Sequence, residues 1–133
     1  MRLEVIASDA WVVLSFVDSR GHCPVKEMLD DVQRTDPTAH AELAALVGRI
    51  CRSGPPRDKR RSRHLEGGVY ELKTPRGLRL LYFFDRGRLI VCTELCRKPK
   101  PRELRALIRR AQGLRSDYLA ASAAGDIVIE RGA

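Results

Sequence analysis

The stretch GGVYELKTPRGLRLLYFFD, residues 67–85, decides most of the fold. Its two halves, residues 67–74 and 77–85, are rich in β-branched and aromatic side chains and are bounded by turn residues, so each is expected to form a strand. The sequence TPRGL between them fits a three-residue hairpin loop, because Pro75 suits the first αR position and Gly77 suits the αL position. The two strands are therefore expected to pair as an antiparallel hairpin.

The hairpin loop also predicts which residues face each other across the two strands. It places Lys73 opposite Arg79 and assigns both, together with Glu71, to one face of the sheet. The core face is expected to carry Tyr70, Leu72, Leu80 and Tyr82. Two like charges directly across a strand pair destabilise it by a few tenths of a kcal/mol or more, so we interpret Lys73 and Arg79 as an anion site. Partial neutralisation of the pair by Glu71 is the alternative.

Upstream of the hairpin, the pattern predicts two strands followed by two helices. Residues 10–17 (AWVVLSFV) form the main strand and residues 2–6 add a short one. After a turn at residues 18–24, apolar residues recur at helical spacing. A second helix is expected to start at Asp36, which can cap a helix that begins with a proline, and to end near Cys51. The expected apolar faces are Val25, Met28, Leu29 and Val32 in the first helix, and Ala39, Leu43, Leu46, Val47 and Ile50 in the second.

Downstream, residues 88–96 predict a third strand and a helix begins near Pro101. Residues 57–64 (RDKRRSRH) contain no apolar side chain and are expected to form an exposed, mobile loop. The tail after Leu119 is small and polar, with a short strand at residues 127–129. The helix is expected to bury Leu104, Leu107, Ile108, Ala111 and Tyr118.

These elements predict an α+β fold: a small antiparallel sheet with an N-terminal helical hairpin and a C-terminal helix. At 133 residues, one domain spanning residues 1–133 is expected, with its core in residues 11–119 and a small polar tail at 120–133.

Basic residues are concentrated in one part of the chain. The net charge is +8, but residues 1–48 hold 4 basic and 8 acidic side chains, for a net of −4. Residues 49–115 hold 20 basic and 6 acidic side chains, for a net of +14, and residues 116–133 hold 1 and 3, for −2. Such a concentration of positive charge attracts polyanions, although a solvated, solubilising surface is the alternative.

The composition argues against several other classes of protein. No apolar run approaches the roughly 20 residues of a membrane span, and the N-terminus lacks a signal-peptide layout, so a cytoplasmic protein without membrane contacts is expected. The four cysteines form no CxxC pair and only three histidines are present, so reduced thiols are favoured over a metal site.

Four motifs occur in an order that resembles a known family of toxins. They are GHCPVKEMLDDV (21–32), HLEGGVYELK (64–73), GLRLLYFF (77–84) and LCRKPKPRELRALIRRAQ (95–112). Together they resemble the phage-derived, HigB-like branch of the RelE/ParE toxin superfamily, over roughly residues 11–119. The resemblance implies a RelE-like fold and the toxin of a type II toxin–antitoxin system. It also implies an antitoxin partner, expected to be a DNA-binding helix-turn-helix protein, and cleavage of mRNA on the translating ribosome.

The resemblance also assigns site residues. It implies that Arg79 holds the scissile phosphate, that Lys73 helps to activate the RNA 2′-hydroxyl or to stabilise charge, and that Arg97 and Lys98 are the cations before the last helix. No cofactor and no metal are implied, because the 2′-hydroxyl is itself the nucleophile. Preorganised cations stabilise the charge that develops on phosphate oxygens, and a lysine among arginines releases its proton more readily.

The sequence departs from the family pattern at two points. Glu71 stands where some relatives carry a second strand lysine, and the start of the last segment carries Glu103 rather than a tyrosine. His64 is a candidate acid or base, although a single histidine at a loop end is more often incidental. The residues expected to bind RNA or the ribosome are Arg57, Lys59, Arg60, Arg61, Arg63, Arg76, Arg102, Arg105 and Arg109.

Three functions stay open on the sequence. The first is a ribosome-dependent mRNA endoribonuclease. The second is a non-catalytic inhibitor on the same fold, which binds a cellular protein as ParE-like relatives do. The third is a plain RNA-binding module, which would bind with strong salt dependence and without cleavage. The group of Lys73, Arg79 and Lys98 distinguishes them, because nuclease action needs these cations and protein binding does not.

Overall fold

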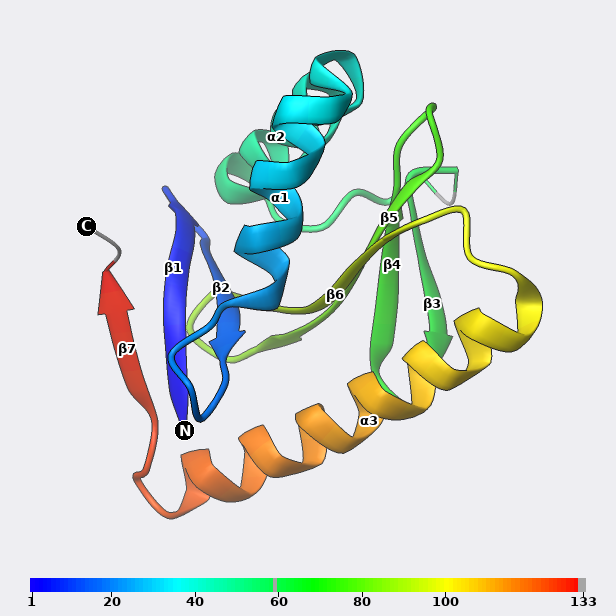
Figure 1. Ribbon diagram of the computed structural model, residues 1–133. Coiled ribbons are helices and arrows are strands. Elements are labelled where there is room, and N and C mark those ends of the chain that lie inside the picture. The colour runs from blue at the N-terminus through cyan, green and yellow to red at the C-terminus, as the bar shows by residue number, and fades with distance from the viewer. Residues whose placement is uncertain (59, 132–133) are drawn as a thin grey trace.

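A computed structural model describes residues 1–58 and 60–131 of the chain as a single sheet with helices on both sides (Figure 1). The two N-terminal helices and the long C-terminal helix confirm the α+β fold class. The elements, in chain order, are β1 (Arg2–Ser8), β2 (Val12–Val17), α1 (Pro24–Thr35), α2 (Pro37–Ser53), β3 (Ser62–Glu66), β4 (Val69–Lys73), β5 (Leu78–Asp85), β6 (Leu89–Arg97), α3 (Pro101–Ala123) and β7 (Val128–Arg131).

The sheet is mixed, so the prediction of an antiparallel sheet was wrong in part. Its strand order is β3-β4-β5-β6-β2-β1-β7. Strands β3 to β6 pair antiparallel, whereas β2 runs parallel to β6 and β7 runs parallel to β1. The alternation of apolar and polar residues has the same period in both kinds of sheet, so the sequence pattern could not distinguish them.

The two faces of the sheet bury different side chains. Helices α1 and α2 cover one face, where Leu72, Leu80 and Tyr82 pack against the helical residues Val32 and Leu43. Helix α3 crosses the other face (Figure 1), and its residues join two smaller clusters there. These clusters centre on Leu81 with Ala111 and on Phe83 with Tyr118. Each strand therefore alternates between a face covered by α1 and α2 and a face covered by α3.

The helix boundaries follow the predicted caps. The Asp36 side chain accepts a hydrogen bond from the Ala39 backbone N–H at 3.2 Å, which confirms it as the cap of α2. Helix α3 begins at Pro101, as predicted, but it continues to Ala123.

The β4–β5 hairpin has the predicted register. Lys73 lies opposite Arg79, and Tyr70 lies opposite Tyr82. In the turn, the Leu78 backbone N–H donates to Thr74 Oγ1 at 3.0 Å, and Gly77 has φ +88°. A positive φ favours glycine, so the turn chemistry predicted the register correctly.

The predicted loop at residues 57–64 is in part an edge strand. Residues from Ser62 onward form β3, which pairs antiparallel with β4. Ser62 is buried, and its hydroxyl lies 2.7 Å from the Tyr82 hydroxyl beneath the sheet. An edge strand that exposes most of its side chains needs no apolar alternation, so the hydropathy pattern carried no signal for it.

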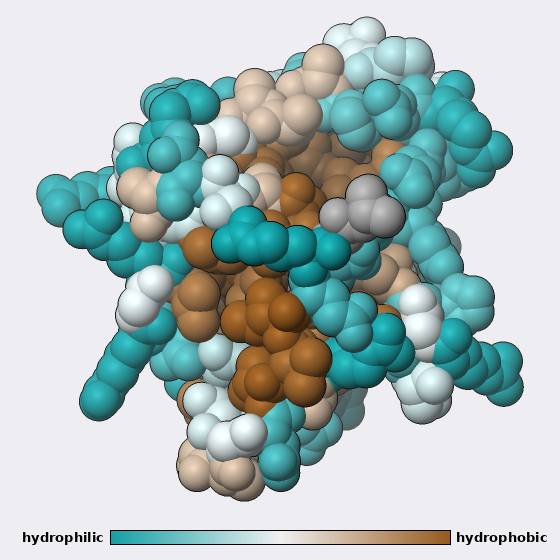
Figure 2. Space-filling model, turned by 90° about the vertical axis from the view of Figure 1, so that its left-hand side faces the viewer, coloured by the Kyte–Doolittle hydropathy of each residue, from teal (hydrophilic) through white to brown (hydrophobic). Residues whose placement is uncertain are grey.

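The predicted polar tail also takes part in the fold. Residues 120–123 belong to α3, and β7 pairs with β1 from Val128 onward. Figure 2 looks onto this side of the molecule and shows an apolar patch. Val128 and Ile129 of β7 are among the large apolar residues exposed to solvent.

We predict that Tyr82→Phe lowers the free energy of unfolding by about 1–3 kcal/mol, because it leaves the buried Ser62 hydroxyl without its partner. Burial raises the pKa of Tyr82 to about 12, so wild-type stability should also fall as the pH rises from about 10 toward 12. Urea unfolding at pH 8 and pH 11 measures both effects. The double variant Ser62→Ala/Tyr82→Phe should recover part of the loss. Equal stabilities of wild type and Tyr82→Phe would show that the hydroxyl pair does not hold β3.

Candidate anion-binding site

The site predicted by the hairpin lies on the face of the sheet that α3 covers. Strand alternation places Glu71, Lys73 and Arg79 on this face, where Leu81 of the core lies opposite Glu71. Lys73 at the end of β4 is exposed, whereas Arg79 on β5 is partly buried. The structure thus brings the two cations to adjacent positions on one face, as the register predicted.

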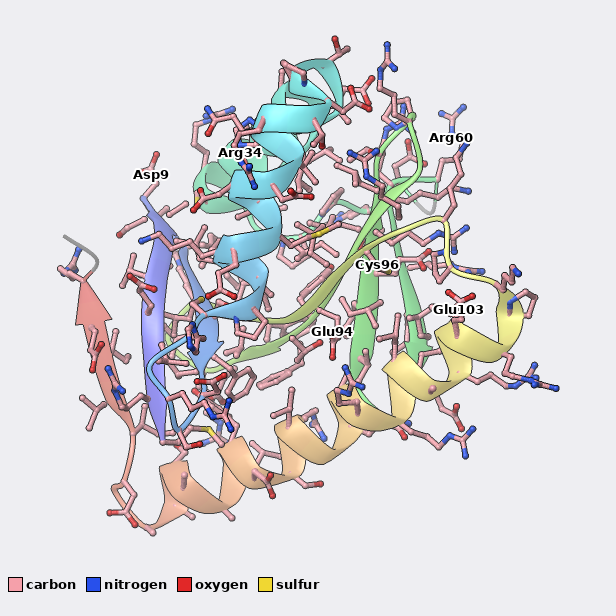
Figure 3. The ribbon with its side chains drawn as sticks, in the orientation of Figure 1. Asp9, Arg34, Arg60, Glu94, Cys96 and Glu103 are labelled. Atoms are coloured by element: carbon pink, nitrogen blue, oxygen red, sulfur yellow. The ribbon has the colours of Figure 1, made fainter. Side chains whose placement is uncertain are left out.

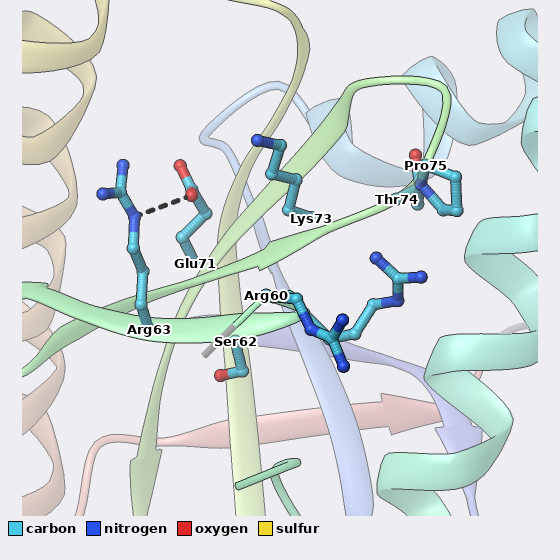
Figure 4. A pocket seen from close by; sticks show the side chains of 8 residues that line it. Arg60, Ser62, Arg63, Glu71, Lys73, Thr74 and Pro75 are labelled. Carbon is cyan, nitrogen blue, oxygen red and sulfur yellow. Dashed lines mark hydrogen bonds and ion pairs between the residues drawn. The ribbon is translucent and has the colours of Figure 1, made fainter. Parts of the chain in front are cut away.

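A cleft of about 420 Å³ opens beside these residues, between the start of β3 and the β4–β5 turn (Figure 4). We call it the basic cleft. Its lining is Arg60, Arg61, Ser62, Arg63, Glu71, Lys73, Thr74 and Pro75. Four of these side chains are basic and one is acidic, so the lining carries a net charge of +3. Such a cleft favours an anionic ligand.

Glu71 is the buried centre of the site. Its side chain is 2% exposed, and its two carboxylate oxygens each accept a hydrogen bond. Arg63 Nε donates to Oε1 at 3.1 Å, and Arg79 Nη1 donates to Oε2 at 3.1 Å. A buried carboxylate is costly unless it is paired, and these two arginines provide the pairing. Glu71 therefore neutralises Arg79, as the alternative interpretation of the hairpin anticipated, but it has no such bond to Lys73 in the part of the chain that the structure describes.

Arg79 keeps unused hydrogen-bonding capacity. Its side chain is 19% exposed, and its Nε is buried without a hydrogen-bond partner among residues 1–58 and 60–131. A guanidinium has five donors, so a ligand that reaches Arg79 can be bound without breaking the bond to Glu71.

The neighbouring strand β6 and helix α3 add a thiol and two carboxylates to this face. Cys96 lies opposite Arg79 on β6, and burial raises its pKa to about 11. Glu94 and Cys96 lie on the side of β6 that faces α3, and Glu103 comes from the first turn of that helix (Figure 3). A thiol with a raised pKa stays protonated at neutral pH, so Cys96 is a poor nucleophile here.

Arg97 lies away from this group. Its Nη1 bonds Asp36 Oδ2 at 3.5 Å, on the side of the sheet that α1 and α2 cover. The cause is a bulge in β6: Leu81 pairs with Glu94 and Tyr82 pairs with Cys92, which leaves one extra residue between them. The extra residue reverses the side on which every later residue of β6 points. Lys98 follows at the end of the strand, exposed, with its aliphatic chain beside Gly77 of the hairpin turn.

His64 also lies on the other face of the sheet. Its ring stacks at a tilt on Tyr70, with 4.9 Å between the ring centroids. Its Nε2 accepts a hydrogen bond from the Gly68 backbone N–H at 3.2 Å, so this ring nitrogen is occupied by the β3–β4 turn. The structure does not bring His64 together with Lys73 and Arg79.

The remaining predicted RNA contacts fall into three groups. Arg60, Arg61 and Arg63 line the basic cleft, and Arg57 is exposed just before it. Arg76 is exposed at the tip of the β4–β5 hairpin. The exposed residues on α3 are Arg102, Arg105 and Arg109. Lys59, the other predicted residue, lies outside the described residues.

Two uncharged polar residues of the cleft were not among the predicted site residues. Ser62 and Thr74 line it, and both are buried. The place of Ser62 depends on β3 being a strand, which the hydropathy pattern did not predict, whereas Thr74 belongs to the predicted β4–β5 turn. Within residues 1–58 and 60–131, no three histidine, cysteine or acidic side chains gather in a way that would hold a metal ion. None of the helices described is long and apolar enough to cross a membrane.

The fold and the basic cleft thus define a small α+β protein with a concentrated cationic site on one face of its sheet. Residues 30–115 match the family described as phage derived protein Gp49-like (DUF891), so the chain belongs to the Gp49-like family. This family is related to the RelE/HigB-type toxins. None of the curated proteins matches the chain at a significant level.

We predict that Glu71→Gln tightens binding of a short single-stranded RNA and lowers the free energy of unfolding by roughly 1–3 kcal/mol. The change raises the net charge of the basic cleft by one and weakens the bonds to Arg63 and Arg79. Fluorescence anisotropy at two salt concentrations and urea unfolding measure the two effects. Glu66→Gln is the matched control, because Glu66 is an exposed carboxylate on the same edge strand. Equal RNA affinity of the two variants would show that Glu71 does not limit anion binding.

Proposed function

We propose that the protein is a HigB-like toxin that cleaves mRNA on the translating ribosome. The observation that supports this most is the juxtaposition of Lys73 and Arg79 across the β4–β5 hairpin, beside the basic cleft. Two cations at paired positions destabilise a hairpin, so their presence on a partly open face favours a ligand with negative charge. Membership of the Gp49-like family adds the relation to RelE/HigB-type toxins.

In this proposal the reaction is an in-line attack by the RNA 2′-hydroxyl on the neighbouring phosphorus. The bond from O2′ to phosphorus forms, the bond from phosphorus to O5′ breaks, and the products are a 2′,3′-cyclic phosphate and a 5′-hydroxyl. No metal or cofactor is required, because the nucleophile belongs to the substrate. Negative charge grows on the phosphate oxygens in the transition state, where fixed cations stabilise it most.

Arg79 is the residue proposed to hold that phosphate. Its bond to Glu71 fixes the guanidinium, and the partly exposed side chain has further N–H donors for the phosphate oxygens. A cation held in place before the substrate arrives needs little reorganisation during the reaction.

The proton of the 2′-hydroxyl is proposed to pass to Glu71, and the Lys73 ammonium is proposed to donate the proton that the departing O5′ needs. Lys73 is exposed at the mouth of the site, whereas Glu71 already accepts one bond from each of two arginines. A carboxylate oxygen has a second lone-pair direction, so Glu71 can accept a further hydrogen bond without losing either arginine. Two cations at the end of β6, Arg97 and Lys98, were predicted to belong to the site. Lys98 lies beside the β4–β5 turn, whereas Arg97 points toward Asp36, so Lys98 is the one that can join the site.

A non-catalytic inhibitor on the same fold is the second candidate, and one observation favours it. Glu71 neutralises the arginine that the nuclease proposal needs, where some relatives of the toxin carry a lysine. In that case the basic cleft would bind an acidic surface of a cellular protein. RNA cleavage during translation distinguishes the two functions, because only the nuclease produces new mRNA 5′ ends.

The partners follow from the proposed function. An antitoxin must neutralise the toxin before it reaches the ribosome, and a DNA-binding helix-turn-helix protein fits the family relation. The basic cleft and the arginines of α3 are the surfaces proposed for ribosomal RNA, which proteins contact through its phosphates without reading sequence. The cytoplasm is the compartment in which these partners occur.

We predict that Arg79→Ala abolishes growth inhibition in a bacterium that expresses the protein, and that it lowers mRNA cleavage by at least about 100-fold. The variant should stay folded, because Glu71 keeps its bond to Arg63. Mapping of mRNA 5′ ends after induction measures cleavage, and circular dichroism verifies the fold. Arg86→Ala, in the exposed β5–β6 turn, is the control and should retain full activity. Full toxicity of a folded Arg79→Ala variant would show that Arg79 does not hold the scissile phosphate.

We also predict clear cleavage of translated mRNA and slow or absent cleavage of free RNA. The site holds phosphate through cations, while the aromatic rings of Tyr70 and Tyr82 pack on the other face, so few rings remain to stack bases. A ribosome can supply the in-line geometry by holding the mRNA extended, which removes an entropic cost.

Replacement of Arg102, Arg105 and Arg109 by glutamine should weaken ribosome association and flatten its salt dependence, since fewer phosphate contacts release fewer counterions. Cosedimentation with ribosomes across a salt series, beside cleavage of naked RNA, provides the test. Efficient cutting of naked RNA by a protein that binds no ribosomes at any salt would contradict the mechanism.

A further inference from the structure

A second cavity lies away from the basic cleft, where β2 and β6 cease to pair. The last paired residues are Ser15 and Cys92, and the bulge in β6 follows directly. The strands separate there, and the N-terminus of α1 and the middle of α3 close the space from either side. The result is a cavity of about 350 Å³, within the size range of small-molecule sites.

The walls of this cavity are mainly apolar, with one buried hydroxyl that lacks a partner. The apolar walls come from Met1, Phe16, Val17, Pro24, Val25 and Leu114. Ser15 is fully buried, and its Oγ has no hydrogen-bond partner in the described part of the chain. Thr93, the other hydroxyl in the lining, already donates to the Leu81 carbonyl at 3.3 Å. A buried hydroxyl without a partner is costly, so Ser15 is the polar group that a ligand would satisfy.

The charged groups at this cavity have hydrogen-bond partners within the protein. Arg110 Nη1 donates to Glu94 Oε1 at 3.0 Å, and Arg2 Nε donates to Glu130 Oε1 at 2.8 Å. Asp18 Oδ1 accepts from two backbone N–H groups of the turn that follows β2. The N-terminal ammonium of Met1, which also lies at this cavity, donates to the Asp126 carbonyl at 2.6 Å. Each of these charged groups therefore already has a hydrogen-bond partner within the described part of the protein. The electrostatics therefore favour an uncharged ligand.

We propose that this cavity binds a small, uncharged, mainly apolar molecule with one hydroxyl or carbonyl group that hydrogen-bonds Ser15 Oγ. The hydroxyl of Ser15 can donate to a carbonyl or accept from a hydroxyl, so it selects for one polar atom in an otherwise apolar ligand. This inference does not depend on the proposed RNA cleavage, because the cavity shares none of its lining residues with the basic cleft.

The test uses phenol as the probe and toluene as its apolar counterpart of similar size. Titration of each into the ¹⁵N-labelled full-length protein should shift amide resonances of residues 15–18, 93–94 and 110–114. Phenol should bind more tightly than toluene, and Ser15→Ala should weaken phenol about three- to tenfold while leaving toluene unchanged, as expected for loss of one hydrogen bond.

Two further variants locate the binding. Leu114→Trp fills the cavity and should abolish binding of both probes, whereas Leu119→Trp, at an exposed position of the same helix, should have no effect. Because Ser15→Ala removes only a hydroxyl, the test stands even if Leu114→Trp fails to fold. The proposal is overturned if phenol shifts other residues, if phenol and toluene bind alike to the wild type, or if neither binds and the cavity holds only water.

Discussion

The ion pairs of Glu71 with Arg63 and Arg79 are the interaction on which the candidate site depends. The three residues come from β4, β3 and β5 respectively, so one buried carboxylate links three neighbouring strands. A buried carboxylate is costly unless it is paired, and each of the two arginines contributes to that pairing. In turn, each arginine gains a fixed orientation that a solvated side chain would lack. The same bonds limit the free positive charge of the site. Glu71 therefore both orients Arg79 and partly neutralises its charge.

The hairpin and its surroundings differ in how far the sequence could predict them. Pro75 and Gly77 fixed the loop type, and the loop type fixed the register, so the pairing of Lys73 with Arg79 followed from local chemistry alone. Strand β3 is held by contacts that no local pattern contains: its pairing with β4, the ion pair of Arg63 with Glu71, and the hydroxyl pair of Ser62 with Tyr82. Its exposed side chains need no periodicity, so hydropathy predicted a loop. Strand β7 is similar, because its place beside β1 is set by the length of α3 and the turn after it.

The bulge in β6 explains the largest difference between the expected and the observed site. Simple alternation from Val91, which packs on the α3 side, would point Arg97 toward that side and toward Arg79. The extra residue in β6 reverses the alternation, so Leu95 joins the core beneath α1 and α2, and Arg97 meets Asp36. The same irregularity opens the cavity beside Ser15. A single inserted residue thus moves one cation away from the basic cleft and creates a second concave site.

The distribution of charge in space also differs from its distribution along the chain. The segment of residues 49–115 carries a net of +14, yet the lining of the basic cleft carries only +3, because the strands and helices direct the other cations to different faces. At physiological ionic strength, exposed charges are screened beyond about 8 Å, so charges outside the cleft add little to the potential within it. They remain available to a ligand long enough to contact several surfaces at once. A small anion would interact only with the cleft, whereas an extended polyanion could contact the hairpin tip at Arg76 and the arginines of α3 as well. This arrangement suits a polymer of phosphates better than a single phosphate group.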